Sequence, residues 1–270
     1  MKKILALVLA LVLCASMVCV ASAETTSEKT ALEKVLAAGK LVVGTEATYP
    51  PYEYLDDNAN FAGCDIWLAQ QIADALGVKL EIVDQAFDGI IPAVQAGGAD
   101  IGIAAFTITP ERAEVIDFSD MYETSAQLLI VKAGNGETYA DKESLKGLKV
   151  GAQLGTIQSS LVESALPDSE LFELDTYPNL ALETVNGNIA GFVVDYAVGM
   201  AMVNSSDGAL EVAKFEFSAE EASFGKACVV AKGADDLLAK VNEVIAKVTA
   251  DGSYQAAYDA AVAATGETGE

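Results

Sequence analysis

The sequence predicts an α/β fold made of two similar open lobes. From residue 40 onward, short strand-like runs alternate with helical patterns, beginning with "KLVVGT", "DIWLAQQIADALG" and "VKLEIVD". Such alternation is typical of parallel strands joined by crossover helices. The pattern starts afresh at "LKVGAQLGTIQ", after the Gly- and charge-rich passage "QLLIVKAGNGETYADKESLKG". Two series of this kind indicate two lobes.

The two series finish alike. In the first, "AVQAGGADIGIAAFT" predicts a helix end, a glycine turn and a strand that finishes at residues 104–107. In the second, "ETVNGNIAGFVVD" repeats this layout and finishes at Asp195. Open α/β sheets bind ligands beyond the carboxyl ends of their strands. We therefore expect the functional loops of both lobes to face one cleft.

The C-terminal segment "DDLLAKVNEVIAKVTADG" predicts an amphipathic helix. Because it has one apolar face, we expect it to pack against a lobe that is already formed. The residues on that face are Leu237, Leu238, Val241, Val244, Ile245 and Val248.

The N-terminus has the pattern of a secretory signal peptide over residues 1–23. Two lysines precede an apolar run of 17 residues, and "ASA" then matches a small-x-small cleavage site. An uncleaved anchor is the alternative, because such a run lies at the lower limit for spanning a membrane. A lipid anchor on Cys14 or Cys19 is a further alternative, disfavoured by the bulky residue before each cysteine. We expect export of residues 24–270 to the periplasm or the cell surface.

Composition narrows the function. Without its two N-terminal lysines the chain has 14 basic and 40 acidic residues, a net charge of −26, which repels nucleic acid and anionic membranes. The exported chain keeps Cys64 and Cys228, which form either one bridge or, as we favour, two buried free thiols. The absence of histidine removes the usual general base and zinc ligand, and argues against an enzyme.

The segment "AAFTITPERAEVIDFS" raises the question of what Arg112 binds. Thr109 is a predicted helix N-cap and Pro110 a predicted first helical residue, which places Arg112 in the first turn. A cation is mildly disfavoured at that end of a helix, so an anion should compensate it. The alternative to a bound anion is a loose surface pair with Glu111 or Glu114.

Arg112 and Asp195 together suit a free amino acid. The planar guanidinium fits a carboxylate, whereas the aspartate offers a counter-charge for an ammonium group. Aromatic faces would cover the ligand's apolar stem. Alternatively, the aromatic residues are packing groups, Thr107 bonds its own backbone and Asp195 caps the next helix. The remaining candidates, from the loops and from "QLGTIQ", are Glu46, Tyr49, Tyr52, Phe87, Gln153, Thr156 and Ile157.

The chain resembles the extracytoplasmic amino-acid-binding proteins of ABC importers, the polar amino-acid family of solute-binding proteins. The match rests on "LVVGTEATYPPYEY", "GCDIWLAQQIADALG", "FDGIIPAVQAGGADIGIAAFTITPERAEVIDFSDMY", "LKGLKVGAQLGTIQ" and "FVVDY". The resemblance implies that Arg112 binds the ligand carboxylate and Asp195 the amino group. It further implies ligand contacts by Tyr49, Phe87, the backbone at Ala105, the Thr107 hydroxyl, Gln153 and the amide near Ile157.

The resemblance also implies the two-lobed periplasmic-binding-protein fold. One domain would comprise residues 24–131 and 224–270, and the other residues 134–218. Two crossovers, near 131–133 and 219–224, would form the hinge. The implied partners are a free amino acid and the membrane permease of an ABC importer, and we expect a monomer without cofactor or metal.

Glu46 leads us to expect arginine or lysine as the ligand, because a carboxylate among aromatic rings suits a cationic side chain. In the alternative, Glu46 points away and pairs with a lysine, and Gln153 selects a neutral polar ligand such as glutamine or cystine. Two other functions remain as hypotheses. One is a cyclohexadienyl-dehydratase-like enzyme that uses Glu46 as its acid. The other is a sensory ligand-binding domain.

Overall fold

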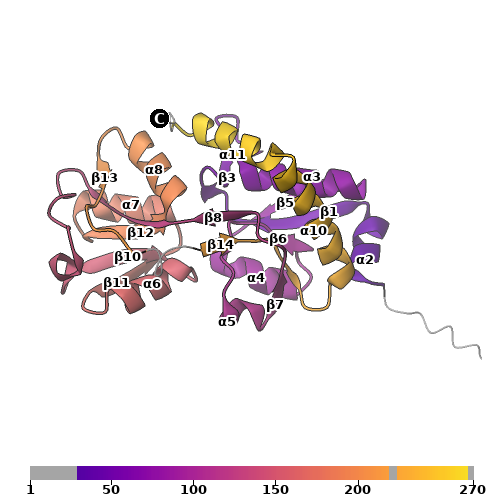
Figure 1. The fold of residues 1–270 in the computed structure, drawn as a ribbon, viewed down its shortest axis with the longest axis horizontal. Coiled ribbons are helices and arrows are strands. Elements are labelled where there is room, and N and C mark those ends of the chain that lie inside the picture. The colour runs from indigo at the N-terminus through magenta and orange to yellow at the C-terminus, as the bar shows by residue number, and fades with distance from the viewer. Residues whose placement is uncertain (1–28, 219–223, 267–270) are drawn as a thin grey trace, which may run out of the picture.

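The computed structural model describes residues 29–218 and 224–266 of the chain. The predicted signal peptide, residues 1–23, therefore lies outside the described residues. Figure 1 shows two lobes side by side, connected by the strands β8 (Glu123–Ser125) and β14 (Phe224–Lys226), which pair with each other in antiparallel fashion. The predicted fold of two α/β lobes is confirmed.

The first lobe is built on a five-stranded sheet. β1 pairs in parallel with β5 and β6, and the antiparallel β15 follows beyond β6. The order across the sheet is β5 (Lys79–Asp84), β1 (Lys40–Thr45), β6 (Ile101–Gly102), β15 (Val229–Ala231) and β7 (Ile116–Phe118).

The second lobe repeats this design. β10 pairs in parallel with β11 and β12, and the antiparallel β9 follows beyond β12. The repeat explains why the two series in the sequence look alike. The order is β11 (Glu170–Leu174), β10 (Lys149–Gln153), β12 (Gly191–Asp195), β9 (Gln127–Lys132) and β13 (Leu210–Val212).

The predicted crossover at residues 131–133 is wrong in position. β9 lies wholly within the second sheet, where Gln127 is the register partner of Asp195. The chain therefore leaves the first lobe before residue 127, through β8. An apolar run predicts a strand but not the sheet that it joins, because pairing depends on partners distant in sequence. Of the second crossover, residues 219–223 lie outside the described residues.

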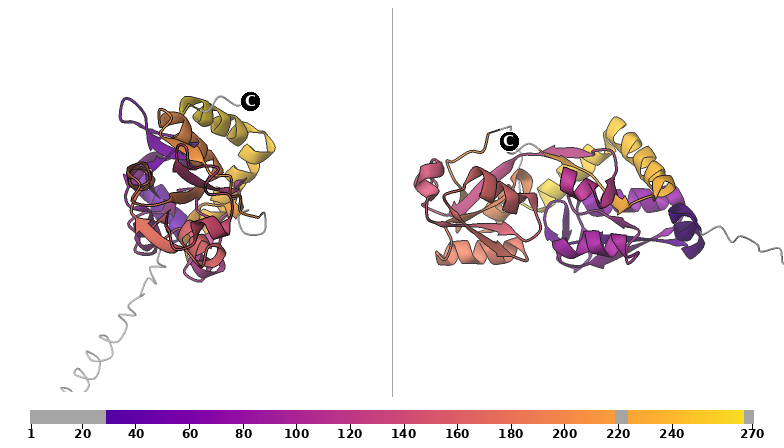
Figure 2. Two further views of the ribbon diagram at one scale, coloured as in Figure 1. Left: turned by 90° about the vertical axis from the view of Figure 1, so that its left-hand side faces the viewer. Right: turned by 90° about the horizontal axis from the view of Figure 1, so that it is seen from below.

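Helices cover both sheets. In the first lobe, α3 (Cys64–Leu76) packs on β1 and β5, and the C-terminal helices lie over α3 (Figure 1, Figure 2). The predicted apolar face of the C-terminal helix is confirmed, since five of its six residues are buried and Leu238 is partly buried. The other long helices of the first lobe are α2 (Ala31–Ala38), α4 (Phe87–Gln95), α10 (Asp235–Ala250) and α11 (Ser253–Ala264). Those of the second lobe are α6 (Ile157–Ala165), α7 (Tyr177–Asn186) and α8 (Tyr196–Ser205).

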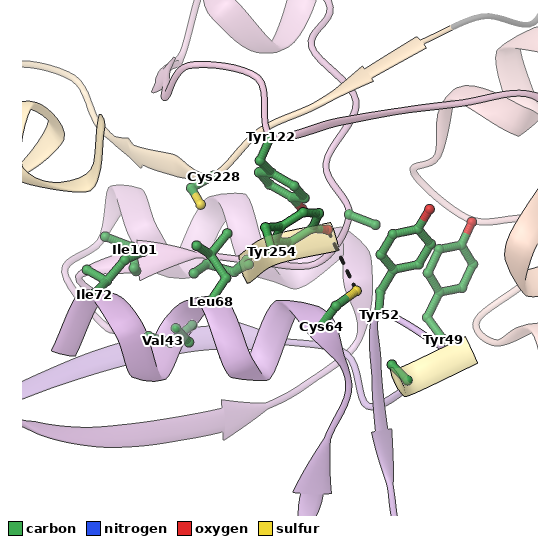
Figure 3. Packing of buried hydrophobic residues seen from close by; sticks show 14 of the residues in the cluster. Val43, Tyr49, Tyr52, Cys64, Leu68, Ile72, Ile101, Tyr122, Cys228 and Tyr254 are labelled. Carbon is green, nitrogen blue, oxygen red and sulfur yellow. Dashed lines mark hydrogen bonds between the residues drawn. The ribbon is translucent and has the colours of Figure 1, made fainter. Parts of the chain in front are cut away.

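One apolar core of the first lobe lies between α3 and the sheet, and a second includes Ile90 and Val94 of α4. Figure 3 shows Leu68 and Ile72 of α3 facing Val43 and Ile101. Cys64 and Cys228 are both buried free thiols, as we favoured from the sequence. Short elements complete the described chain: β2 (Thr48–Tyr49), β3 (Glu53–Leu55), β4 (Phe61–Ala62), α5 (Pro110–Ala113) and the 3₁₀ turn η1 (Lys142–Leu145).

Candidate ligand-binding site

The carboxyl ends of β1, β6, β10 and β12 meet at a cleft between the lobes, as the rule for open α/β sheets predicts. The enclosed cavity is about 20 Å³, room for about one water molecule, so an amino acid can enter only if the lobes separate. All predicted site residues except Tyr52 line it. The lining consists of Glu46, Tyr49, Glu53, Phe87, Ala104, Ala105, Thr107, Arg112, Gln153, Thr156, Ile157, Gln158 and Asp195.

Arg112 takes the predicted place in α5. Thr109 is the N-cap, its hydroxyl accepts from the Arg112 amide, and Pro110 begins the helix. The guanidinium donates to the carbonyl oxygens of Thr107 (2.9 Å) and of Gly155 in the other lobe (3.0 Å). It also lies over the rings of Phe87 and Phe106, at 5.4 and 5.5 Å from their centroids.

The guanidinium keeps capacity for an anion. It has five N–H donors, and the two carbonyl oxygens that accept from it carry no formal charge. Within residues 29–218 and 224–266, Arg112 forms no ion pair, so the surface pair with Glu111 or Glu114 is absent. Burial lowers the pKa of Arg112 to about 10, which leaves it cationic at neutral pH.

The N-terminus of α6 lies beside Arg112. Thr156 is its N-cap and accepts from the Ser159 amide, and Ile157 begins the helix. Amides in the first turn of a helix lack intrahelical acceptors, and the helix dipole is positive there. This end of the cleft therefore suits a carboxylate.

Gly155, just before the cap, lies close to the first lobe. It has φ +75°, and an added Cβ would lie 2.9 Å from the Cβ of Asp88.

Asp195 occupies the N-cap position of α8 but does not cap it. Its carboxylate makes no bond to the helix amides. Instead, it is 2% exposed and accepts from the Tyr49 hydroxyl (2.6 Å), the Gln127 amide (2.5 Å) and the Lys226 ammonium. The alternative that Asp195 is only a helix cap is therefore wrong.

Ala105 presents its carbonyl on the opposite side of the cleft. It has φ +48°, an uncommon conformation for alanine. The buried carboxylate of Asp65 accepts from the Ala105 amide (2.7 Å) and from the Tyr122 hydroxyl (2.9 Å), and thereby holds this turn. The Ala105 carbonyl oxygen lies 3.5 Å from the Lys226 ammonium.

Glu46 faces the cleft rather than the solvent. It is 4% exposed and accepts from the hydroxyl of Thr48 and from the amide of Gln153, the latter at 3.3 Å. In the described part of the chain no lysine pairs with it. Burial is the main reason that its pKa rises from 4.5 to about 7.

Tyr52 does not line the cavity. Its ring lies beside that of Tyr49 (Figure 3), with centroids 5.8 Å apart. The Lys226 ammonium lies over the same ring, 4.7 Å from its centroid. Its hydroxyl donates to Glu123 at the start of β8 (2.8 Å). Tyr52 thus supports the site from the core, and its contact with ligand stays a prediction from the sequence.

Several residues of the site escaped the sequence analysis. Glu53 and Gln158 line the cavity, whereas Gln127 and Lys226 bond to Asp195 from β9 and β14. The sequence contains one indication of Lys226, because "FGKACVV" places a charge within an apolar strand. It contains no indication of Gln127, since that side chain reaches Asp195 only through the pairing of β9 with β12, which the sequence did not predict.

The described part of the chain lacks two further kinds of site, a metal centre and a membrane-spanning helix. Residues 29–218 and 224–266 contain no group of three or more potential ligand side chains that could hold a metal ion. Over the same ranges, no helix is both long and apolar enough to cross a bilayer.

The model of the bacterial extracellular solute-binding proteins, family 3, matches residues 41–262. The chain belongs to this family, which confirms the predicted resemblance. It is similar to the L-cystine-binding protein TcyJ of Escherichia coli (strain K12), with 32% identity over 225 residues, covering 83% of this chain and 83% of that protein.

Solved structures share the fold. The amino acid ABC transporter substrate-binding protein AbpA from Streptococcus pneumoniae, bound to L-arginine, is 32% identical with a TM-score of 0.83, covering 87% of this chain and all of that one. The ancestral amino acid-binding protein AncCDT-1, a precursor of cyclohexadienyl dehydratase, is 33% identical with a TM-score of 0.77, covering 86% and 99%. The likeness confirms the two-lobed fold.

Proposed function

We propose that this protein captures a free amino acid outside the cytoplasm and delivers it to the permease of an ABC importer. The observation that carries the proposal is the arrangement of Arg112 and Asp195 across one cleft. Arg112 and the start of α6 offer donors to a carboxylate, and Asp195 and the Ala105 carbonyl offer acceptors to an ammonium group. Similarity to a protein named for binding L-cystine, and to a substrate-binding protein whose structure holds L-arginine, supports this function.

We propose arginine or lysine as the ligand. Glu46 supports a cationic side chain, because it is a buried carboxyl that lines the cavity and, among the described residues, accepts only from Thr48 and Gln153. A guanidinium or ammonium would stabilise its ionised form. Aspartate and glutamate are excluded by repulsion from the same carboxylate. Cystine and glutamine remain the competing ligands, through the Gln153 amide.

Calorimetric titration of refolded protein, stripped of carried-over ligand, tests the ligand. Arginine, lysine, glutamine, cystine, aspartate and glutamate would be titrated separately. We expect the tightest binding from arginine or lysine and none from the two acids. Tighter binding of cystine or glutamine would contradict the cationic assignment but keep the binding function, whereas absence of binding by every amino acid would contradict the function itself.

A dehydratase is the second candidate, and Glu46 is the observation that favours it. A carboxyl with a pKa of about 7 in a closed cleft has the property of a general acid. One similar structure is an ancestral precursor of such an enzyme. Incubating pure protein with prephenate or arogenate and measuring product separates the candidates. Turnover by the wild type that Glu46→Gln abolishes would establish the enzyme. No turnover by the wild type would leave the binding protein as the function.

We also propose that the protein acts after export, in the periplasm or at the cell surface, as a monomer free of a lipid anchor. A high net negative charge supports a dispersed, soluble protein. Light scattering of the exported protein checks the monomer, and a dimer mass at micromolar concentration would contradict it.

A further inference from the structure

Lys226 is a buried lysine at the junction of the lobes. Among the described lysines it alone is buried, with 1% of its surface exposed. It ends β14, one of the two strands that connect the lobes. Buried lysines require a compensating partner, because transfer of an ammonium group out of water is costly.

The partner belongs to the other lobe. The Lys226 ammonium lies 2.5 Å from the Asp195 carboxylate and 3.5 Å from the Ala105 carbonyl oxygen, above the ring of Tyr52. Asp195 ends β12 of the second lobe, and Ala105 follows β6 of the first. The ion pair therefore fastens the two lobes together when the cleft is closed.

These two acceptors are the ones that the proposed function assigns to the ligand's α-ammonium. We propose that Lys226 is a tethered ammonium that competes with the ligand's α-ammonium for Asp195 and Ala105, and so sets the affinity and specificity of the cleft. This inference rests on the proposed function. Removing Lys226 should therefore increase the difference in affinity between a ligand that has an α-amino group and one that lacks it.

Displaced from Asp195, the Lys226 ammonium still has two carboxyl groups near it, those of Asp65 and Glu123. Burial raises the pKa of each, and the nearby charge of Lys226 opposes part of that rise because it favours the ionised forms. Tyr52 also provides its ring face. The displaced lysine can thus keep its charge while a ligand occupies Asp195.

The competition has opposite signs for two ligands. Arginine brings its own ammonium, so removing Lys226 abolishes a competitor and a like charge, and arginine binds more tightly. δ-Guanidinovalerate, which is arginine without its α-amino group, leaves Lys226 on Asp195 in the complex. Removing Lys226 then leaves the buried Asp195 carboxylate without a cationic partner, so this analogue binds more weakly.

The experiment titrates both ligands into refolded wild type, Lys226→Met and the control Lys232→Met. Lys232 is an exposed lysine, paired with Asp117 at 2.7 Å. We expect Lys226→Met to tighten arginine binding about tenfold or more and to weaken the analogue by a similar factor, as for close charge pairs at interfaces. Lys232→Met should change neither. Equal weakening of both ligands, or no change, would overturn the inference.

A second measurement needs no ligand. Because the ion pair holds the lobes together, the radius of gyration of ligand-free Lys226→Met, from small-angle X-ray scattering, should exceed that of wild type. If neither protein binds arginine, the arginine assignment is wrong, and the radius of gyration of the ligand-free proteins then decides the inference about Lys226. An unchanged radius would overturn that inference. Lys226→Gln, which keeps a polar side chain without the charge, replaces the methionine variant if that variant does not fold.

Discussion

The Tyr49 hydroxyl of the first lobe donates to the Asp195 carboxylate of the second at 2.6 Å. The bond exists only when the lobes meet, and a bond to a charged group contributes about 1.5–3 kcal/mol. We therefore expect Tyr49→Phe to weaken arginine binding about tenfold in calorimetry. Tyr52→Phe is the matched control. Its hydroxyl bonds to Glu123, so its loss should lower the free energy of unfolding rather than the affinity. The reverse pattern would contradict this division of roles.

Arg112→Ala should abolish ligand-induced stabilisation. Arginine at about 100 times its Kd should add roughly 2.7 kcal/mol, which is a rise in Tm of about 5 to 10 °C for a chain of this size. The variant should lose that rise, yet still fold and melt cooperatively without ligand, because Arg112 lines the cleft and only its guanidinium overlies the rings of Phe87 and Phe106. Normal binding by the variant, or its unfolding, would show that the carboxylate assignment is wrong.

Binding of a cationic ligand should strengthen with pH through Glu46. The pKa of Glu46 is raised to about 7, so its carboxylate is largely protonated at pH 5.5 and ionised at pH 8.5. Arginine affinity should therefore rise across this interval. Glu46→Gln should weaken arginine binding by about tenfold at pH 8.5 and flatten the pH dependence. Glutamine or cystine binding that is tight and unaffected by the substitution would favour the neutral-ligand alternative.

The ligand-free protein should lose stability as pH rises from about 4.5 to 7, and Glu123 should contribute to the loss. Burial raises the pKa of Glu123 from 4.5 to about 7, so the folded state binds its proton more tightly than the unfolded state. This contribution is fully present below pH 4.5 and is lost as the pH rises through 7, about 3 kcal/mol in all. Urea denaturation should show a smaller decline for Glu123→Gln than for wild type. A decline of equal size would exclude Glu123 as its source.

Processing should expose Glu24 as the first residue of the exported protein. The "ASA" before it matches a signal-peptidase site. Intact-mass spectrometry of protein recovered from the native host checks this. A diacylglyceryl mass on Cys14 or Cys19 would instead show a lipid-anchored surface protein.

Local patterns predicted much of the fold. Two series of alternating strands and helices became two lobes, and residues at or just beyond the end of each key strand became cleft residues, because the carboxyl ends of parallel strands lie along one edge. The position of the first crossover was not predictable in this way. Gln127–Lys132 is an apolar run that could pair in either sheet, and only its antiparallel fit beside β12 placed it in the second.

The sequence by itself determined the local environment of Arg112. Thr109 caps the helix and Pro110 starts it, and both effects act within a few residues of chain. Only the tertiary structure decided the partners of Asp195. Tyr49 and Lys226 lie 146 and 31 residues from it along the chain, yet their donors share one carboxylate oxygen. Such contacts form only after both lobes have folded and closed, because no short-range preference of the chain selects them.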